Sequence, residues 1–200
     1  MTHYLYLVRH GEQQDAEHGM EDGPLSPRGI RQVRMLADRL GGVPFTGAYH
    51  SPLTRGEQTA RVLAERLPAI DPEPSNLLFD CIPSGPGPGT PKSFEPFFHG
   101  ISDVQIEAGH AQMDDAIAEF LSPSRAERHD LLITHNFVIA WFVREVMDAP
   151  TWRWLGLNAA NASLTVIRHR PAKKPELLVF NDLGHLPAEL RTGLPEVLPF

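Results

Sequence analysis

Short apolar runs alternate along the chain with longer stretches in which apolar residues recur at helical spacing. The short runs predict strands at 4–8, 47–50, 77–79, 131–134, 162–168 and 176–181. Apolar residues three or four positions apart predict helices at 27–40, 53–67, 105–121 and 136–147. This alternation predicts an α/β fold: a doubly wound, mostly parallel sheet with helices on both faces.

Two segments lack such periodicity. Residues 81–98 are rich in Pro and Gly, which excludes long regular elements, while three Phe side chains favour docking of this segment on the domain. A long loop that begins beside a site often selects its ligand, so we predict that 81–98 lies over the site. Residues 184–200 are predicted to form an irregular tail, because their prolines exclude a long helix. We expect a single domain over residues 1–200.

Composition narrows the classes of function. The formal net charge of −7 argues against a nucleic-acid surface, so a phosphate site would have to be locally basic. Cys81 is the only cysteine and cannot form an internal disulfide, as expected in a reducing cytoplasm. The chain begins almost directly on a strand and has no apolar run of membrane-spanning length. We therefore expect a cytoplasmic protein without a membrane or nucleic-acid partner.

Two histidines follow predicted strands. His10 comes after Arg9 at the end of the first strand, and His135 follows the strand 131–134 and precedes Asn136 and a helix. Ligands in such folds bind beyond the carboxyl ends of the strands, where both histidines would lie. A neutral imidazole can accept a phosphoryl group when cations hold the oxygens of that group, and Arg9 supplies one cation. The ten histidines show no metal-ligand spacing, so no metal site is predicted.

A second arginine has a similar setting. Arg55 lies just after the strand 47–50, near the start of the next helix, whose N-terminal dipole favours an anion. The planar guanidinium binds phosphate oxygens in pairs, which lysine cannot do. Either arginine alone fits a surface salt bridge, but two arginines and two histidines at strand ends indicate a shared phosphate site.

Four motifs, in family order, resemble those of the histidine phosphatase superfamily, also called phosphoglycerate-mutase-like. They are Leu7-Val8-Arg9-His10-Gly11-Glu12, Leu25-Ser26-Pro27-Arg28-Gly29 with Gln32, the run 51–60, and Thr134-His135-Asn136. The resemblance implies that His10 is the nucleophile and that Arg9, Arg55, His135 and Asn136 bind the phosphoryl group. It also implies that neither metal nor cofactor is needed. It also implies a carboxylic acid as proton donor. By position this is Asp80, with Glu107 as the alternative.

Later segments resemble one branch of that superfamily, which contains a mitochondrial serine/threonine protein phosphatase. The segments are 77–83, 134–139 and 154–165. The resemblance implies hydrolysis of a phosphoprotein side chain or of another small phosphomonoester through phospho-His10. A phosphoglycerate-type mutase and a non-catalytic phosphopeptide-binding protein are the alternatives. Because the ordinary pKa of histidine is about 6.5, we expect activity to depend on mildly acidic to neutral pH. The physiological substrate and the oligomeric state do not follow from the sequence.

Overall fold

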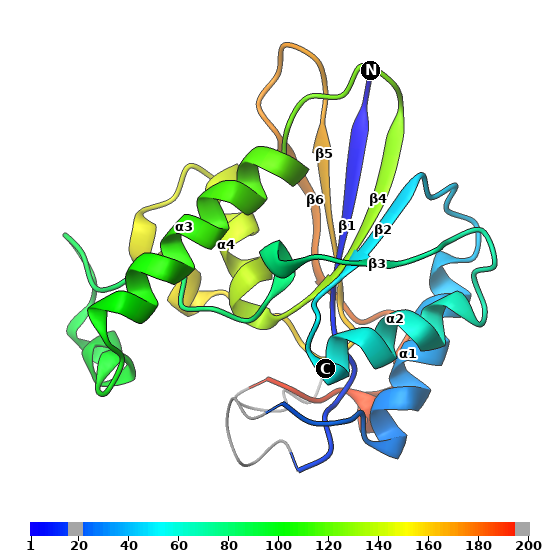
Figure 1. Cartoon of the computed structure of the whole chain (residues 1–200), viewed down its shortest axis with the longest axis horizontal. Coiled ribbons are helices and arrows are strands. Elements are labelled where there is room, and N and C mark those ends of the chain that lie inside the picture. The colour runs from blue at the N-terminus through cyan, green and yellow to red at the C-terminus, as the bar shows by residue number, and fades with distance from the viewer. Residues whose placement is uncertain (16–21, 195–200) are drawn as a thin grey trace.

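A computed structural model describes residues 1–15 and 22–194 of the chain. Its centre is a six-stranded sheet in the order β3-β2-β4-β1-β5-β6 (Figure 1). The strands are β1 (His3–Arg9), β2 (Gly47–His50), β3 (Glu73–Pro74), β4 (Arg128–Thr134), β5 (Leu164–His169) and β6 (Glu176–Asp182). β3, β2, β4 and β1 run parallel, whereas β5 is antiparallel to both β1 and β6. The predicted α/β fold with a mostly parallel sheet is confirmed.

Helices cover both faces of this sheet. Helices α1 (Pro27–Leu40) and α2 (Thr54–Ala64) lie on one face, and α3 (Asp103–Phe120) and α4 (Asn136–Val146) lie on the other (Figure 1). Leu7 of β1 packs in the core under α3 and α4, and its neighbour Val8 packs in the core under α1 and α2. A strand buried on both faces has no exposed side to make polar, which explains the apolar runs at 4–8 in β1 and 131–133 in β4.

Local sequence signals mark where helices begin. Ser26 caps α1, because its hydroxyl accepts a hydrogen bond from the Gly29 amide, and Pro27 occupies the first turn. Ser102 and Gln105 form a reciprocal capping box at the start of α3. The predicted helices therefore agree with the observed ones to within a few residues at each end.

The strand predicted at 77–79 was wrong. Asn76–Leu78 forms a 3₁₀ turn, η2, with Leu78 completely buried. The strand lies just before it, at Glu73–Pro74, and pairs with β2 at the edge of the sheet. Pro has no backbone N–H group to donate. It is tolerated in an edge strand because one side of that strand has no neighbouring strand to accept a hydrogen bond. An apolar pair of leucines alone does not distinguish a buried turn from a strand.

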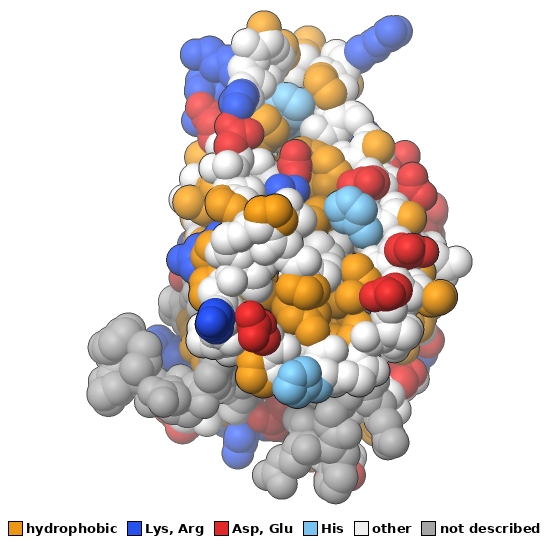
Figure 2. All heavy atoms as spheres, turned by 90° about the vertical axis from the view of Figure 1, so that its left-hand side faces the viewer, with side chains coloured by type: hydrophobic (Ala, Val, Ile, Leu, Met, Phe, Trp, Pro, Cys, Tyr) orange, Lys and Arg blue, Asp and Glu red, His pale blue; other side chains and the backbone are white. Residues whose placement is uncertain are grey.

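The Pro/Gly-rich segment is more ordered than its composition predicts. Lys92–Phe98 forms a 3₁₀ helix, η3, between Gly89 and Gly100, which both have positive φ. The Phe97 ring contacts the rings of Phe137 and of Trp154, which belongs to the 3₁₀ helix η4 (Thr151–Gly156). Figure 2 shows the side of the molecule that carries α3, where hydrophobic side chains remain exposed among charged ones.

The predicted irregular tail is partly described. Residues 184–194 contain a short 3₁₀ helix, η5 (Ala188–Leu190), and two buried leucines, Leu186 and Leu190, pack against the domain. Residues 195–200 lie outside the described part of the chain. Among the described residues, no helix combines the length and apolar character that crossing a membrane requires.

Candidate active site

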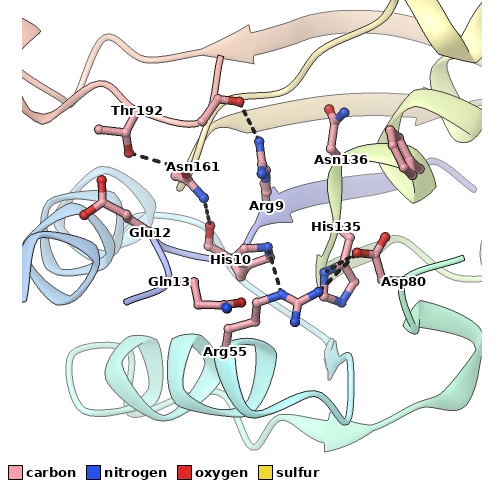
Figure 3. Close-up of a pocket in the computed structure, with 12 residues that line it drawn as sticks. Arg9, His10, Glu12, Gln13, Arg55, Asp80, His135, Asn136, Asn161 and Thr192 are labelled. Carbon is pink, nitrogen blue, oxygen red and sulfur yellow. Dashed lines mark hydrogen bonds and ion pairs between the residues drawn. The ribbon is translucent and has the colours of Figure 1, made fainter. Parts of the chain in front are cut away.

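A cavity of about 330 Å³ lies at the carboxyl ends of β1 and β4 (Figure 3). The two strands are neighbours in register, so that Arg9 pairs with Thr134, and the His10 amide donates to the Thr134 carbonyl over 3.0 Å. The cavity is lined by Arg9, His10, Glu12, Gln13, Arg55, Asp80, His135, Asn136, Phe137, Asn161, Thr192 and Gly193. All six residues that the sequence placed in the site therefore meet around one cavity.

His10 is held in one orientation. Its Nδ1 lies 2.7 Å from the Gly11 carbonyl oxygen, which can only accept, so we assign the ring proton to Nδ1. Nε2 then carries the lone pair and accepts from Arg55 Nε over 3.2 Å. Burial lowers the pKa of His10 well below its ordinary value, and the charges of Arg9 and Arg55 lower it further. The imidazole is consequently neutral at neutral pH, as a nucleophile must be.

Arg9 is anchored from behind. Its Nη1 donates to two carbonyl oxygens, Ala159 at 2.7 Å and Gly193 at 2.8 Å. Its Nε is buried without a hydrogen-bond partner among the described residues. Burial lowers the pKa of Arg9 to about 10, while Asp80 acts in the opposite direction. The guanidinium therefore stays charged at neutral pH and has a donor to offer to a ligand.

Arg55 connects the nucleophile to an acid. It lies in the first turn of α2 and its side chain is 4% exposed. Besides its bond to His10, it donates from Nη2 to Asp80 Oδ2 over 3.1 Å (Figure 3). Its Nη1 donates to Asp22 Oδ1 over 3.5 Å. The guanidinium is thus pointed into the cavity by partners on several sides.

His135 occupies the N-cap position of α4, with its ring centroid 5.1 Å from that of His10. Its Nε2 lies 2.8 Å from Ser51 Oγ, which itself accepts from the Leu53 amide. If the Ser51 hydroxyl donates to Nε2, the ring proton is on Nδ1, which is buried with no hydrogen-bond partner among the described residues. Burial lowers the pKa of His135 well below its ordinary value, and the charges of Arg55 and Arg9 act in the same direction. A neutral His135 therefore has an N–H group on the side of its ring that faces Asp80, 3.7 Å from Asp80 Oδ2.

Asp80 lies between Arg55 and His135. Its Oδ2 is 3.7 Å from His135 Nδ1, and its side chain is 19% exposed. Burial raises the pKa of the Asp80 carboxyl, although the charges of Arg55 and Arg9 oppose the rise. Glu107, the alternative acid, is exposed on α3 and does not line the cavity. The position and the pKa direction both favour Asp80 as an acid that can hold a proton.

Together these groups match a phosphoryl group. Arg9, Arg55, His135 and Asn136, the first residue of α4, line the same cavity and all carry N–H donors. Donors of this kind bind the oxygens of an anion. Within the described ranges, no group of three or more His, Cys, Asp or Glu side chains is arranged to hold a metal ion.

Asn136 lines the cavity and also makes a hydrogen bond to the loop beside it. Its Oδ1 accepts from the Ala159 amide over 2.7 Å. The side chain therefore holds the loop whose carbonyl anchors Arg9, in addition to lining the cavity.

Sequence reasoning missed several residues of the cavity wall. Glu12 and Gln13 stand in the first motif but were assigned no role, and the remaining residues are Phe137, Asn161, Thr192 and Gly193. Asn161 and Phe137 fall in segments that carried the family resemblance. Thr192 and Gly193 have no signal of their own, because the chain that separates them from His10 exceeds 180 residues and only folding brings them together.

Comparison with known proteins agrees with the family resemblance of the sequence motifs. A family model described as the histidine phosphatase superfamily (branch 1) matches residues 5–78. Mitochondrial serine/threonine-protein phosphatase PGAM5 of Rattus norvegicus is 27% identical over 196 residues, covering 94% of this chain and 65% of that protein. The Caenorhabditis elegans protein of that name is 28% identical over 192 residues, covering 93% and 65%. This chain thus spans just under two thirds of the length of these relatives.

The solved structure of Bacillus stearothermophilus YhfR has the same fold. It superposes with a TM-score of 0.73 at 20% identity, covering 92% of this chain and 98% of that one. The curated relatives are named as mitochondrial proteins, which contradicts the cytoplasmic location expected from the sequence. That expectation depended on the single cysteine, on the strand near the start of the sequence and on the lack of a long apolar run. One unpaired thiol does not distinguish between reducing compartments.

Proposed function

We propose that this chain, which is similar to proteins of the histidine phosphatase superfamily, hydrolyses phosphomonoesters through a phosphohistidine formed on His10. One observation carries the proposal. The Nε2 of a buried, neutral His10 points into a cavity that also receives Arg9, Arg55 and His135. This arrangement provides a nucleophile and the cations that a phosphoryl group needs.

Binding comes first. The phosphoryl oxygens would take the free donors of Arg9 and His135 and those of Arg55, which in the structure is paired with Asp80. An incoming anion would compete with the Asp80 carboxylate for Arg55. Loss of that contact removes one of the influences that hold the pKa of Asp80 down, so binding would favour its protonated form.

The first chemical step transfers the phosphoryl group. The His10 Nε2 lone pair attacks phosphorus, a P–N bond forms, and the bond between phosphorus and the leaving oxygen breaks. Asp80 gives its proton to that oxygen, and the alcohol departs. The positive charges of Arg9 and Arg55 stabilise the charge on the phosphoryl oxygens throughout.

The second step regenerates the enzyme. Water attacks phosphorus, Asp80 now takes a proton from the water, and the P–N bond to His10 breaks as inorganic phosphate forms. The same carboxyl group is acid in one step and base in the next. His135 and the arginines hold the phosphoryl group in both. Neither step needs a metal ion or an organic cofactor.

For the substrate, we propose a phosphorylated protein side chain, serine or threonine, or a small phosphomonoester. The names of the curated relatives as serine/threonine-protein phosphatases support the former. The cavity, at about 330 Å³, would hold the phosphorylated side chain, with the rest of a protein substrate outside it.

The test is phosphate release in excess chelator. Purified protein would be given p-nitrophenyl phosphate and peptides that carry phosphoserine, phosphothreonine or phosphotyrosine. We expect turnover by the wild type and by His99→Gln, a matched change at an exposed histidine outside the cavity, and none by His10→Gln. A phosphoenzyme that is labile in acid and stable in alkali should form only when His10 is present.

Different failures have different meanings. Turnover by His10→Gln would exclude the phosphohistidine, and loss of turnover in chelator would exclude a metal-independent reaction. Transfer of label to a second hydroxyl with little free phosphate would indicate a mutase. Tight binding of phosphopeptide without any turnover would indicate a binding protein.

A further inference from the structure

The C-terminal segment reaches back to the loop that carries the nucleophile. Gln32 of α1 is completely buried, and its Nε2 donates to the Leu190 carbonyl over 2.7 Å and to Thr192 Oγ1 over 2.8 Å. Its Oε1 accepts from the Glu12 amide over 2.8 Å. One amide side chain thus links residues 190–192 to the backbone two positions after His10.

Asn161 makes a second connection between the C-terminal segment and the loop that carries His10. Its side-chain Nδ2 donates to the His10 carbonyl over 3.3 Å, and its backbone amide donates to the Thr192 carbonyl over 2.9 Å. Its Oδ1 accepts from Thr192 Oγ1 over 3.2 Å (Figure 3). The hydroxyl of Thr192 therefore accepts from Gln32 and donates to Asn161, joining the two side chains that hold the backbone at His10 and at Glu12.

Gly193 completes the arrangement. Its carbonyl accepts from Arg9 Nη1, and its φ of +80° lies in the left-handed region that favours glycine. A Cβ at this position would lie 2.2 Å from Asn161 Oδ1 and 2.9 Å from Arg9 Nη1. No other residue fits without displacing the Asn161 side chain or the Arg9 guanidinium.

The contacts of Gln32 and Asn161 are poorly replaceable, because these two side chains are buried. Gln32 is 0% exposed and Asn161 is 5% exposed, so water cannot readily take the place of a lost partner. A buried donor or acceptor left unsatisfied costs more than the bond contributes when made, and the loop would shift to recover a partner. Such a shift would move the His10 carbonyl, the Glu12 amide, or the Arg9 guanidinium.

We propose that Thr192 and Gly193 are positioning residues of the active site: they form a clamp that holds the His10 loop and aims the Arg9 guanidinium into the cavity. The inference rests on the proposed phosphate chemistry. Misplacement of a catalytic group by about 1 Å costs on the order of 100-fold in rate. Thr192→Val, which removes the hydroxyl and keeps the shape, should therefore lower kcat/KM by roughly 10- to 100-fold.

The experiment compares Thr192→Val, Thr192→Ser and Gly193→Ala with Thr151→Val, which makes the same change at an exposed threonine outside the cavity. Turnover of p-nitrophenyl phosphate and the Kd for inorganic phosphate are both measured, with thermal unfolding to show that each variant is folded. We expect Thr192→Val and Gly193→Ala to bind phosphate more weakly and turn over more slowly. Thr192→Ser, which keeps the hydroxyl, should recover most of both, and Thr151→Val should match the wild type.

The outcomes separate the clamp from the hydrolase. If the wild type turns over substrate, and folded Thr192→Val and Gly193→Ala variants have the same kcat/KM and phosphate affinity as the wild type, the clamp is overturned and the hydrolase is not. An inactive wild type that binds phosphate, with weaker binding in Thr192→Val and recovery in Thr192→Ser, would support the clamp and overturn the hydrolase. A Thr192→Ser variant as poor as Thr192→Val would overturn the role of the hydroxyl.

Discussion

Burial shifts the pKa values of two residues in the cavity in opposite directions. His10 is kept neutral because an imidazolium would be poorly solvated and would lie beside two arginines. The carboxyl of Asp80 is protonated more readily than usual, because burial disfavours its charged form. Opposite shifts in neighbouring groups are how one site obtains both a nucleophile and an acid near neutral pH.

Removing the acid should affect substrates unequally. We expect Asp80→Asn to lower kcat/KM for a phosphoserine peptide by roughly 100- to 10,000-fold, the usual contribution of general acid catalysis. The loss should be much smaller for p-nitrophenyl phosphate, whose leaving group departs as a stable anion without needing a proton. Steady-state kinetics with both substrates measure the difference.

Glu107→Gln is the matched control, because it changes the alternative acid, which is exposed on α3. It should leave both rates unchanged. If Glu107→Gln shows the substrate-dependent loss and Asp80→Asn does not, the proton donor has been assigned to the wrong carboxylate.

The pH dependence should differ from that expected for an ordinary histidine. Because the pKa of His10 is lowered well below 6.5, the nucleophile should stay neutral, and active, as the pH falls through that value. Because the pKa of Asp80 is raised, turnover of a phosphoserine peptide should decline as rising pH removes its proton. The profile of kcat/KM against pH, for the wild type and Asp80→Asn, measures both limbs.

Ionisation of the substrate affects the wild type and Asp80→Asn equally. Only the fall in kcat/KM that deprotonation of Asp80 causes at higher pH should therefore disappear in Asp80→Asn. An alkaline decline that is identical in Asp80→Asn would contradict this assignment.

The segment 81–98 is joined to the cavity wall through aromatic rings. Phe97 of η3 contacts Phe137, with ring centroids 5.5 Å apart, and Phe137 lines the cavity. Trp154 is buried behind both rings and donates to Ser84 Oγ over 2.8 Å, which ties the beginning of the segment to the same cluster. We therefore propose that 81–98 contributes to substrate selection at the mouth of the site.

Truncating the exposed ring tests that proposal. Phe97 is 36% exposed, so Phe97→Ala should preserve the fold while removing apolar surface beside the cavity. We expect KM for phosphopeptides to rise about tenfold, which corresponds to the loss of roughly 1.4 kcal/mol of binding, and KM for p-nitrophenyl phosphate to change little. Val104→Ala, at a residue 74% exposed on α3, serves as the control. Equal effects on both substrates would argue against a role in selection.

At the scale of the whole molecule, the active-site cavity and a buried ionic cluster lie at opposite ends of the parallel strands β1 and β4. The cavity lies where β1 and β4 end, while His3, Arg128 and Asp130 meet near where these strands begin. Asp130 is completely buried and accepts from His3 Nε2 over 2.9 Å. Burial would raise the pKa of Asp130, but the hydrogen bond from His3 and the charge of Arg128 outweigh it and lower the pKa below 3.8.

This cluster should stabilise the fold without affecting catalysis. Asp130→Asn should lower the free energy of unfolding by about 2 kcal/mol, the scale of a hydrogen bond to a charged group, and leave kcat unchanged. A lowered carboxyl pKa contributes stability that is complete above the ordinary value of 3.8 and is lost as the pH falls below it. Urea unfolding of the wild type and the variant at several pH values measures both effects.

Asp38→Asn, which breaks an exposed ion pair with Arg66, should change stability by less than about 1 kcal/mol. An equal loss of unfolding free energy in Asp130→Asn and Asp38→Asn would contradict the stabilising role of the Asp130 cluster. A fall in kcat for Asp130→Asn would contradict its independence from catalysis.

The sequence by itself determined most of the helices and strands, and it placed the candidate catalytic residues at the carboxyl ends of the strands. Helical spacing, the Ser26 cap and the apolar runs of β1 and β4 are local properties, so they could be identified without knowing the fold. The positions of His10 and His135 after two such strands placed them at one edge of a parallel sheet, and Arg9 and Arg55 followed from the same rule.

Tertiary structure alone decided the rest. The antiparallel β5, the edge strand Glu73–Pro74 and the approach of Thr192 and Gly193 to the His10 loop depend on contacts between residues far apart in the chain. The pKa of His10 likewise depends on burial and on charges from other elements, which no local pattern contains. Periodicity records which face of an element is buried, but it does not record which other segment buries it.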